Sequence, residues 1–436
     1  MWAEGVSIES IVGSVGSPVF VYSASVLRER ARAVFDGFGG LGAGVRYAVK
    51  ANGNLSVLRL LIESGCGMDV VSGGELFRAR RAGCPGHRIC FAGVSKTEDE
   101  LRAALGLDGS GEAVGLIDVE SASELRLLDR VAREGGVRAR ALLRVNPDVD
   151  AKTHRHTTTA RPDSKFGIEA EEAVALYARR EVFAGVELLG LHAHIGSPIR
   201  EPARYAAAAG RLAGLAQRIR AGGGTVRVLN LGGGFAHGYG GEAVEPIGAY
   251  ADAVRGTIAG ELARGTEVLI EPGRVIAAGA GVLVVRAVHV KDNPQRSFAL
   301  CDAGMNALAR PALYEAEHRV EPVSLRAGAA RAIDIAGPLC ESTDFLARGR
   351  ALAPVEAGDL LAVLDAGAYG MSMASNYNEH RKAAEVLVDG DRWAVVRERQ
   401  ALEDLVRGEG EPVWRAGSEG RDVWMVGCGC CRGSAG

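Results

Sequence analysis

The pattern of apolar and polar positions divides the chain into two parts. From about Val45 to Ile270, short apolar runs of strand length alternate with longer amphipathic segments of helical periodicity. Runs of the first kind are VRYAVKA, MDVVS, HRICFAG, AVGLIDV, ARALLRV, VELLGLHAHIG, RVLNLGGG and TEVLIEPG. Their alternation with helical segments predicts repeated βα units around a parallel sheet. About eight such units fit this span, which predicts an α/β fold with a (β/α)₈ TIM-like barrel; a doubly wound open sheet is the structural alternative.

After Val275 the pattern changes to β-rich runs bounded by glycine, aspartate and proline. These runs include GVLVVRAVHVKDN, RSFALCDAG, RAIDIAGPLC, DLLAVLDAGAYG and AEVLVDGDRWAVV, and they predict a mostly antiparallel β-domain. The N-terminal SPVFVYS also resembles a strand and could join that sheet. We therefore expect a barrel over residues 27–278 and a β-domain formed by residues 1–26 and 279–415. The Gly- and Cys-rich tail over residues 416–436 is expected to be disordered.

Composition and charge restrict the kinds of partner. The chain has 436 residues, of which 47% are hydrophobic and 24% charged, and its net charge of −3 argues against a nucleic-acid-binding surface. No segment approaches the roughly 18 apolar residues of a membrane helix, and the N-terminus lacks the pattern of a signal peptide. Five scattered cysteines have the spacing of free thiols in a reducing compartment: Cys66, Cys84, Cys90, Cys301 and Cys340. We therefore expect a cytoplasmic protein that acts on a small molecule.

Chemically active side chains stand where several predicted strands end, which is the catalytic face of a parallel barrel. They are Lys50 after RYAV, Asp69 after GM, HAHIGS at 192–197, LGGGF at 231–235 and EPGR at 271–274. The glycines of LGGGF would let backbone N–H groups approach a phosphate, although a tight turn requires the same residues. EPGR brings a carboxylate, a rigid turn and a guanidinium together, and a surface ion pair would look the same.

The histidines leave two interpretations open. His192 and His194 are two residues apart, so on a strand they would point to one face and could approach one ligand. No further metal ligand is evident nearby, and HRH at 154–156 lies in a Thr-rich loop, so we expect no metal site. A lysine amine, a phosphate cradle, a carboxylate and a histidine ring together match the needs of pyridoxal 5'-phosphate. The lysine would form a Schiff base, and the carboxylate would keep the pyridine nitrogen protonated.

Ordered motifs from about residue 45 to residue 380 extend this pattern. They are YAVKAN, DVVSGGE, FAGVSKT, RVNPDVDAKTH, SKFGI, HAHIGS, LGGGF, EPGR, DAGMNALARPALYEA, GPLCESTD and GAYGMSMASNYN. With these motifs in this order, the chain resembles the fold-type III, alanine-racemase-like family of pyridoxal-phosphate-dependent decarboxylases, and within it the enzymes of diaminopimelate. The resemblance implies a cofactor-binding barrel followed by a β-domain, which agrees with the architecture predicted from the hydrophobic pattern.

The resemblance also implies roles for individual residues. Lys50 would be the Schiff-base lysine, His194 would stack on the cofactor ring and Glu271 would pair with the pyridine nitrogen. The other cofactor-binding residues would be Asp69, Glu75, Ser197, Gly233, Gly234, Gly273, Arg274 and Tyr369. Cys340 would protonate the substrate carbon after carbon dioxide leaves. In this family the site forms at a homodimer interface, and the CES segment that contains Cys340 comes from the partner chain.

The expected substrate follows from the residues that would bind its far end. Meso-2,6-diaminopimelate carries a second carboxylate, and arginine pairs with carboxylates in a bidentate manner. In this family the distal group is bound by Arg274, Arg310, Tyr314, Glu341 and Tyr369, all of which are present. Ornithine and arginine decarboxylases have no distal carboxylate to bind, and an aspartate is usual where Glu341 stands. We therefore expect decarboxylation of meso-diaminopimelate to L-lysine, the last step of lysine biosynthesis.

Three alternatives remain open at this stage. A sister decarboxylase could act on carboxynorspermidine, ornithine, arginine or a modified amino acid. An inactive regulator could keep the fold, but such proteins typically lose the lysine or the cysteine, and Lys50 and Cys340 are both present. A racemase of this fold would use a tyrosine of the second domain as the opposite-face acid, whereas this chain offers the CES segment.

Overall fold

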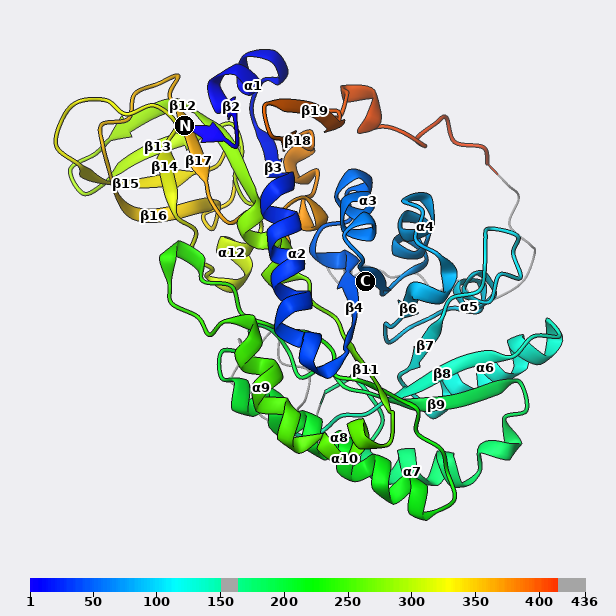
Figure 1. The fold of residues 1–436 in the computed structure, drawn as a ribbon. Coiled ribbons are helices and arrows are strands. Elements are labelled where there is room, and N and C mark those ends of the chain that lie inside the picture. Colours follow the sequence, from blue (N-terminus) through cyan, green and yellow to red (C-terminus); the bar gives the residue numbers. More distant parts are fainter. Residues whose placement is uncertain (150–163, 415–436) are drawn as a thin grey trace, which may run out of the picture.

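A closed barrel of eight parallel strands forms the centre of the molecule (Figure 1). The computed structural model describes residues 1–149 and 164–414, so the HRH segment and the predicted tail lie outside the described residues. The barrel strands, in chain order, are β4 (Gly44–Ala48), β5 (Gly67–Val70), β6 (Ile89–Phe91), β7 (Leu116–Val119), β8 (Ala139–Arg144), β9 (Val186–His192), β10 (Val228–Asn230) and β11 (Glu267–Ile270). The predicted (β/α)₈ barrel is confirmed, and the open-sheet alternative is wrong because β11 pairs with β4 and closes the ring.

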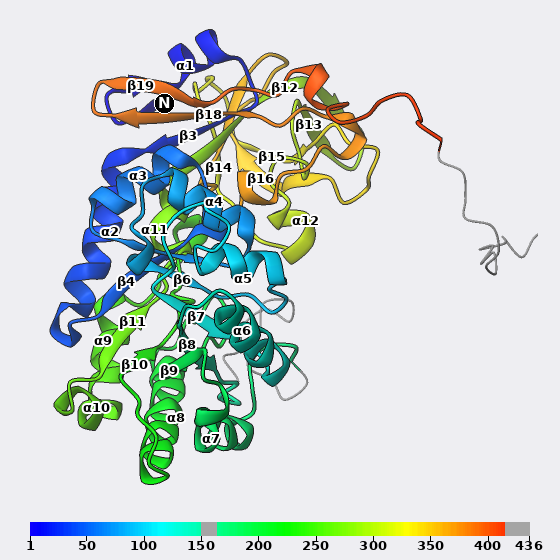
Figure 2. The same ribbon diagram turned by 90° about the vertical axis from the view of Figure 1, so that its right-hand side faces the viewer.

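Helices cover the outside of the barrel (Figure 2). They are α2 (Ala24–Phe38), α3 (Leu55–Glu63), α4 (Gly73–Arg81), α5 (Glu98–Ala104), α6 (Ala122–Glu134), α7 (Ala170–Ala178), α8 (Pro202–Ala221), α9 (Ile247–Thr257) and α10 (Ala259–Ala263). Helices α4 and α6 each begin at a serine cap: the Ser72 and Ser121 hydroxyls accept from the N–H groups of Glu75 and Glu124. In the described ranges 1–149 and 164–414, no helix is both long and apolar enough to cross a membrane.

Apolar and polar side chains occupy different levels of the barrel. One level is a separate apolar cluster drawn from six strands: Cys90, Leu116, Leu142, Leu189, Val228 and Leu269. Buried polar residues lie toward the carboxyl ends of the same strands, among them Asp118, Arg144, His192 and Asn230. Such an apolar layer packs the barrel interior, and the polar carboxyl end is the face at which barrels of this type bind ligands.

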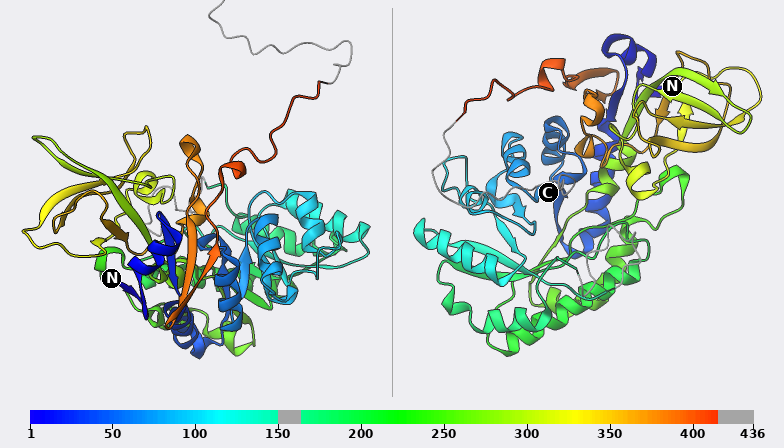
Figure 3. Two further views of the ribbon diagram at one scale, coloured as in Figure 1. Left: turned by 90° about the horizontal axis from the view of Figure 1, so that it is seen from above. Right: turned by 180° about the vertical axis from the view of Figure 1, so that it is seen from behind.

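A second, mostly antiparallel sheet lies beside the barrel (Figure 3). Its strands are β3 (Val19–Ser23), β12 (Gly281–Asp292), β13 (Ser297–Cys301), β14 (Val320–Pro322), β15 (Arg331–Ala336), β16 (Phe345–Leu352), β17 (Leu360–Val363), β18 (Ala384–Asp389) and β19 (Arg392–Arg397). The N-terminal strand β3 lies between β12 and β18, and only β3–β18 and β13–β15 are parallel pairs. The SPVFVYS segment therefore does join the β-domain.

Hydrogen bonds tie this sheet to the loop that carries Lys50. The Tyr369 N–H donates to the Ala51 carbonyl at 2.8 Å, and the Asn52 side chain donates to the Gly367 carbonyl at 3.0 Å. Buried Glu385 on β18 accepts from the Asn54 side chain at 3.0 Å. The β-domain thereby fixes the position of the lysine at the mouth of the barrel.

Candidate active site

Lys50 stands at the end of β4, where the strand gives way to the 3₁₀ turn η2 (Val49–Ala51). Its Nζ lies 3.2 Å from Oδ2 of Asp69, which is on the adjacent strand β5 and fully buried. The Lys50 side chain is 38% exposed and therefore accessible. Burial of the amine acts to lower the pKa of Lys50, but Asp69, Tyr369 and Glu271 together outweigh burial and raise it. Burial and then Glu271 raise the pKa of Asp69 to about 6.

Glu271 follows β11 and is oriented by an asparagine on the neighbouring strand. The Asn230 amide donates to Glu271 Oε1 at 2.6 Å, while its oxygen accepts from the Gly232 N–H at 3.1 Å. The Glu271 N–H in turn donates to the Gly232 carbonyl at 2.8 Å. Burial acts to raise the pKa of Glu271, but His192 and Lys50 outweigh burial and lower it, so this carboxylate is ionised.

His192, whose role the sequence left open, forms a buried pair with Asp118, which the sequence did not single out. His192 Nε2 lies 3.4 Å from Glu271 Oε2, and its Nδ1 lies 3.5 Å from Asp118 Oδ2. These three residues could hold a metal by proximity, since one ligand atom from each lies within 4.8 Å of the others. The two imidazole nitrogens face different carboxylates, so a titratable ring lies between Asp118 and Glu271. A charged residue inside the apolar run LIDV was the available signal for Asp118.

His194 and the glycine-rich loop contact each other. The Gly233 N–H donates to His194 Nδ1 at 3.2 Å, and burial followed by the charge of Lys50 lowers the pKa of His194 to about 3. The ring is therefore neutral. The two histidines thus have different neighbours: His194 contacts Gly233, and His192 contacts two carboxylates.

The glycine loop can hold an anion. A Cβ on Gly233 would lie 1.9 Å from the Glu271 carbonyl oxygen, and Gly234 has a φ of +96°. The backbone N–H groups of Gly234, Gly273 and Arg274 donate to no other residue in the described part of the chain. Three donors on two contacting loops therefore remain available to a bound group.

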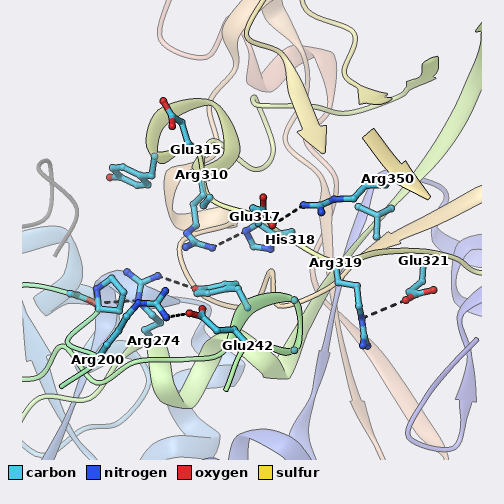
Figure 4. A pocket seen from close by; sticks show the side chains of 18 of the residues that line it. Arg200, Glu242, Arg274, Arg310, Glu315, Glu317, His318, Arg319, Glu321 and Arg350 are labelled. Atoms are coloured by element: carbon cyan, nitrogen blue, oxygen red, sulfur yellow. Dashed lines mark hydrogen bonds and ion pairs between the residues drawn. The ribbon is translucent and has the colours of Figure 1, made fainter. Parts of the chain in front are cut away.

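A cavity of about 920 Å³ contains two buried arginines (Figure 4). Arg274 donates from Nε to Ser197 Oγ at 3.1 Å and from a terminal nitrogen to the Tyr239 hydroxyl at 2.9 Å. The Arg310 guanidinium carbon lies 4.2 Å from the centre of the Tyr239 ring. Arg274 is 8% exposed and Arg310 6%, and neither has a carboxylate within 4.0 Å among the described residues. Tyr314 lines the same cavity.

The remaining predicted residues divide into two sets. Lys50, Glu75 and Tyr369 line a neighbouring cavity of about 510 Å³, and the Tyr369 ring connects it to the first because it lies 4.8 Å from the Arg274 guanidinium carbon. Cys340 and Glu341 line neither cavity, and both are exposed. The chain therefore brings the predicted barrel residues and both arginines together but leaves the CES segment outside.

Comparisons with known proteins agree with this geometry. Residues 25–278 match the family described as pyridoxal-dependent decarboxylase, pyridoxal binding domain. The diaminopimelate decarboxylase of Pseudomonas aeruginosa is 44% identical over 94% of this chain and 96% of its own length. The structure of diaminopimelate decarboxylase from Helicobacter pylori with L-lysine has a TM-score of 0.86 and is 34% identical, covering 92% of this chain and 98% of that one.

A second solved structure gives the same result. The diaminopimelate decarboxylase of M. jannaschii in co-complex with L-lysine has a TM-score of 0.87 and is 33% identical, covering 94% of this chain and 95% of that one. The chain thus belongs to the pyridoxal-dependent decarboxylases and, within this class, to the diaminopimelate decarboxylase family.

The Glu75 carboxyl gives a prediction about stability. Burial outweighs the attraction of Lys50 and raises its pKa from 4.5 to about 7. Between pH 4.5 and about pH 7 the unfolded chain releases a proton from this carboxyl that the folded chain keeps. The carboxyl therefore lowers the free energy of unfolding as the pH rises. Glu75→Gln removes that effect but keeps an oxygen for the Val71 N–H, which donates to it at 2.9 Å. In the cofactor-free protein, the Tm of the variant should rise relative to that of the wild type as the pH increases from about 5 to about 8. A constant difference in thermal unfolding would contradict this.

Proposed function

We propose that the protein removes carbon dioxide from meso-2,6-diaminopimelate and releases L-lysine, with pyridoxal 5'-phosphate as its cofactor. The observation that carries the proposal is the pair Arg274 and Arg310, two buried cations that face one cavity without a described carboxylate partner. Buried charges normally have partners, so such a pair favours a ligand that brings its own carboxylate. The full-length similarity to diaminopimelate decarboxylases supports the same substrate.

The residues around Lys50 suit the cofactor. The accessible Lys50 amine suits its aldehyde, and the ionised Glu271 carboxylate suits its pyridine nitrogen. The neutral His194 ring suits the face of its ring, and the three unpaired N–H donors suit its phosphate. The predicted cofactor-binding residues also include Ser197, Asp69 and Tyr369. When bound, pyridoxal phosphate supplies an electron-accepting ring for the electron pair that remains when carbon dioxide leaves.

The chain's own residues would bind, orient and move protons. Lys50 would carry the cofactor and exchange it with the substrate amine, and Asp69 at 3.2 Å would accept a hydrogen bond from that lysine. Glu271, oriented by Asn230, would hold a proton at the pyridine nitrogen. Arg274, Arg310 and Tyr314 would hold the distal carboxylate, which leaves the reacting carboxylate at the other end. A proton delivered to the α-carbon then replaces the lost carbon dioxide.

The proton donor is proposed to come from a second copy of the chain. Cys340 and Glu341 are exposed and lie outside both cavities of their own chain. A homodimer in which the partner subunit's Cys340 faces Lys50 would complete the site, and a symmetric dimer would contain two such sites. The five described cysteines are all free thiols, which supports a reducing, cytoplasmic location.

A substrate panel tests the proposed function. The purified protein with pyridoxal phosphate is incubated with meso-diaminopimelate, L-ornithine, L-arginine or carboxynorspermidine, and carbon dioxide and product are measured. Lysine formed from meso-diaminopimelate alone is the expected result. Turnover of a substrate without a distal carboxylate would overturn the assignment of the arginine pair.

Arg310→Ala should weaken substrate binding more than the chemical step. Losing one of two buried partners of a carboxylate should raise KM for meso-diaminopimelate by about 100-fold or more. Arg350→Ala is the matched control, because Arg350 lines the same cavity but pairs with Glu317 at 3.5 Å. Steady-state kinetics of both variants check the prediction, and an equal rise in KM for both would contradict it.

A further inference from the structure

His318 is a buried histidine that the proposed mechanism does not use. It lies between α12 (Arg310–Tyr314) and β14 and is fully buried. Its Nε2 lies 2.7 Å from a terminal nitrogen of Arg310, and its Nδ1 lies 2.8 Å from the Leu364 carbonyl oxygen. Figure 4 shows His318 beside Arg310 at the cavity wall. The histidine therefore connects the backbone after β17 to one of the two substrate-facing arginines.

The two partners determine which nitrogen carries the proton. A carbonyl oxygen only accepts hydrogen bonds, so Nδ1 must donate to Leu364. A guanidinium only donates, so Nε2 must accept from Arg310 through its lone pair. The imidazole is therefore a neutral acceptor with one possible tautomer. Burial and then the charge of Arg310 lower the pKa of His318 to about 4, in agreement with this geometry.

A neutral acceptor orients Arg310 without neutralising it. A carboxylate at this position would form an ion pair with the guanidinium and compete with a ligand for it. The acidic residues nearby in sequence do not take that role: Glu315 and Glu317 are exposed, and Glu317 pairs with Arg350. On its other side the Arg310 guanidinium rests on the Tyr239 ring, whose hydroxyl accepts from Arg274. Arg310 is thus held by an uncharged ring on one side and an uncharged acceptor on the other.

We propose that His318 is a positioning residue that aims Arg310 at the distal carboxylate of the substrate while keeping its charge available. This inference rests on the proposed function, because it deepens the selection of a substrate with two carboxylates. It also extends the specificity pocket to a residue of the β-domain that is outside the ALARPALYEA segment. A substrate without a distal carboxylate would gain nothing from this arrangement.

Two substitutions of His318 separate positioning from packing. His318→Gln can place an oxygen where Nε2 lies and so keep the acceptor for Arg310. His318→Asn can keep the donor to Leu364 but is too short to reach Arg310. We expect His318→Asn to raise KM for meso-diaminopimelate by about 10- to 100-fold with kcat within a few-fold, and His318→Gln to raise it much less. The bound-cofactor absorbance and Tm show that each holoenzyme is folded.

A double-mutant cycle with Arg310 completes the test. If His318 acts through Arg310, His318→Asn should change KM less than about twofold in the Arg310→Ala background. Equal KM for His318→Asn and wild type, or an undiminished effect in the Arg310→Ala background, would overturn the inference and leave the proposed function intact. Should His318→Asn fail to fold, His318→Gln is compared with and without Arg310→Ala under the same criterion. Absence of turnover of meso-diaminopimelate by the wild-type holoenzyme would overturn both proposals.

Discussion

Lys50→Ala should abolish decarboxylation and remove the absorbance of covalently held cofactor. Among the described residues, Lys50 is the lysine at the end of a barrel strand beside Asp69 and facing a cavity. Without the Lys50 amine the cofactor cannot be held covalently, and the substrate amine has no lysine to exchange with. We therefore expect kcat to fall by at least about a thousandfold. Spectra of the purified protein with pyridoxal phosphate and carbon dioxide release from meso-diaminopimelate measure the two effects.

Lys382→Ala is a suitable control for this substitution. Lys382 lines the same cavity of about 510 Å³ as Lys50, but it belongs to the β-domain segment that precedes β18. A cofactor bound through Lys50 should keep its absorbance when Lys382 is replaced. Retained turnover and spectrum in Lys50→Ala would contradict the assignment of the lysine. Loss of the spectrum in both variants would instead indicate that the cavity as a whole had been disturbed.

The barrel could be predicted from sequence because its signals are local. Each strand is a short apolar run, and each following helix repeats its apolar positions with helical spacing, as Leu27, Ala31, Val34 and Phe38 do in α2. The site residues at strand ends could also be predicted, because the carboxyl ends of parallel strands meet on one face of the barrel. Lys50 and Glu271 could therefore be predicted to lie on the same face of the barrel.

Pairings between distant segments could not be predicted in this way. Asp118 is a single charge in a buried strand, and only the closed barrel shows that it faces His192 and, through it, Glu271. His318 follows a motif that carried the resemblance, yet its partner Leu364 lies 46 positions away along the chain. Tyr239 likewise gains its importance from Arg274 and Arg310, which come from two different elements. Residues that act through others are visible only once tertiary contacts are known.

Cys340 differs from these residues, because the family resemblance implies a role for it but the contacts within its own chain do not bring it to the site. Its N–H donates to the Asn378 side chain at 3.1 Å, and the Tyr377 hydroxyl donates to Glu341 at 3.2 Å. These contacts order the CES segment at the surface, away from the arginine cavity. An ordered but exposed Cys340 fits the proposal that this residue acts in the site of a second chain.

Mixing two inactive variants should therefore restore activity. Lys50→Ala lacks the amine and Cys340→Ala lacks the proposed proton donor, so each variant alone should be strongly impaired. If subunits exchange at random, half of the dimers are mixed, and one of the two sites in each mixed dimer contains both wild-type residues. The mixture should then recover about a quarter of the wild-type activity. Carbon dioxide release after unfolding and refolding the two proteins together measures this recovery.

A mixture of Lys50→Ala and Glu271→Gln provides the matched control. Both residues belong to the barrel of one chain, so in a mixed dimer each barrel keeps one defect and neither site is intact. We expect no recovery from this pair. Recovery from the Lys50 and Cys340 pair alone would show that the two residues of one site come from different chains. Failure of that pair, with mixed dimers detected by mass, would place the partner subunit's Cys340 outside the site and require another acid for the α-carbon.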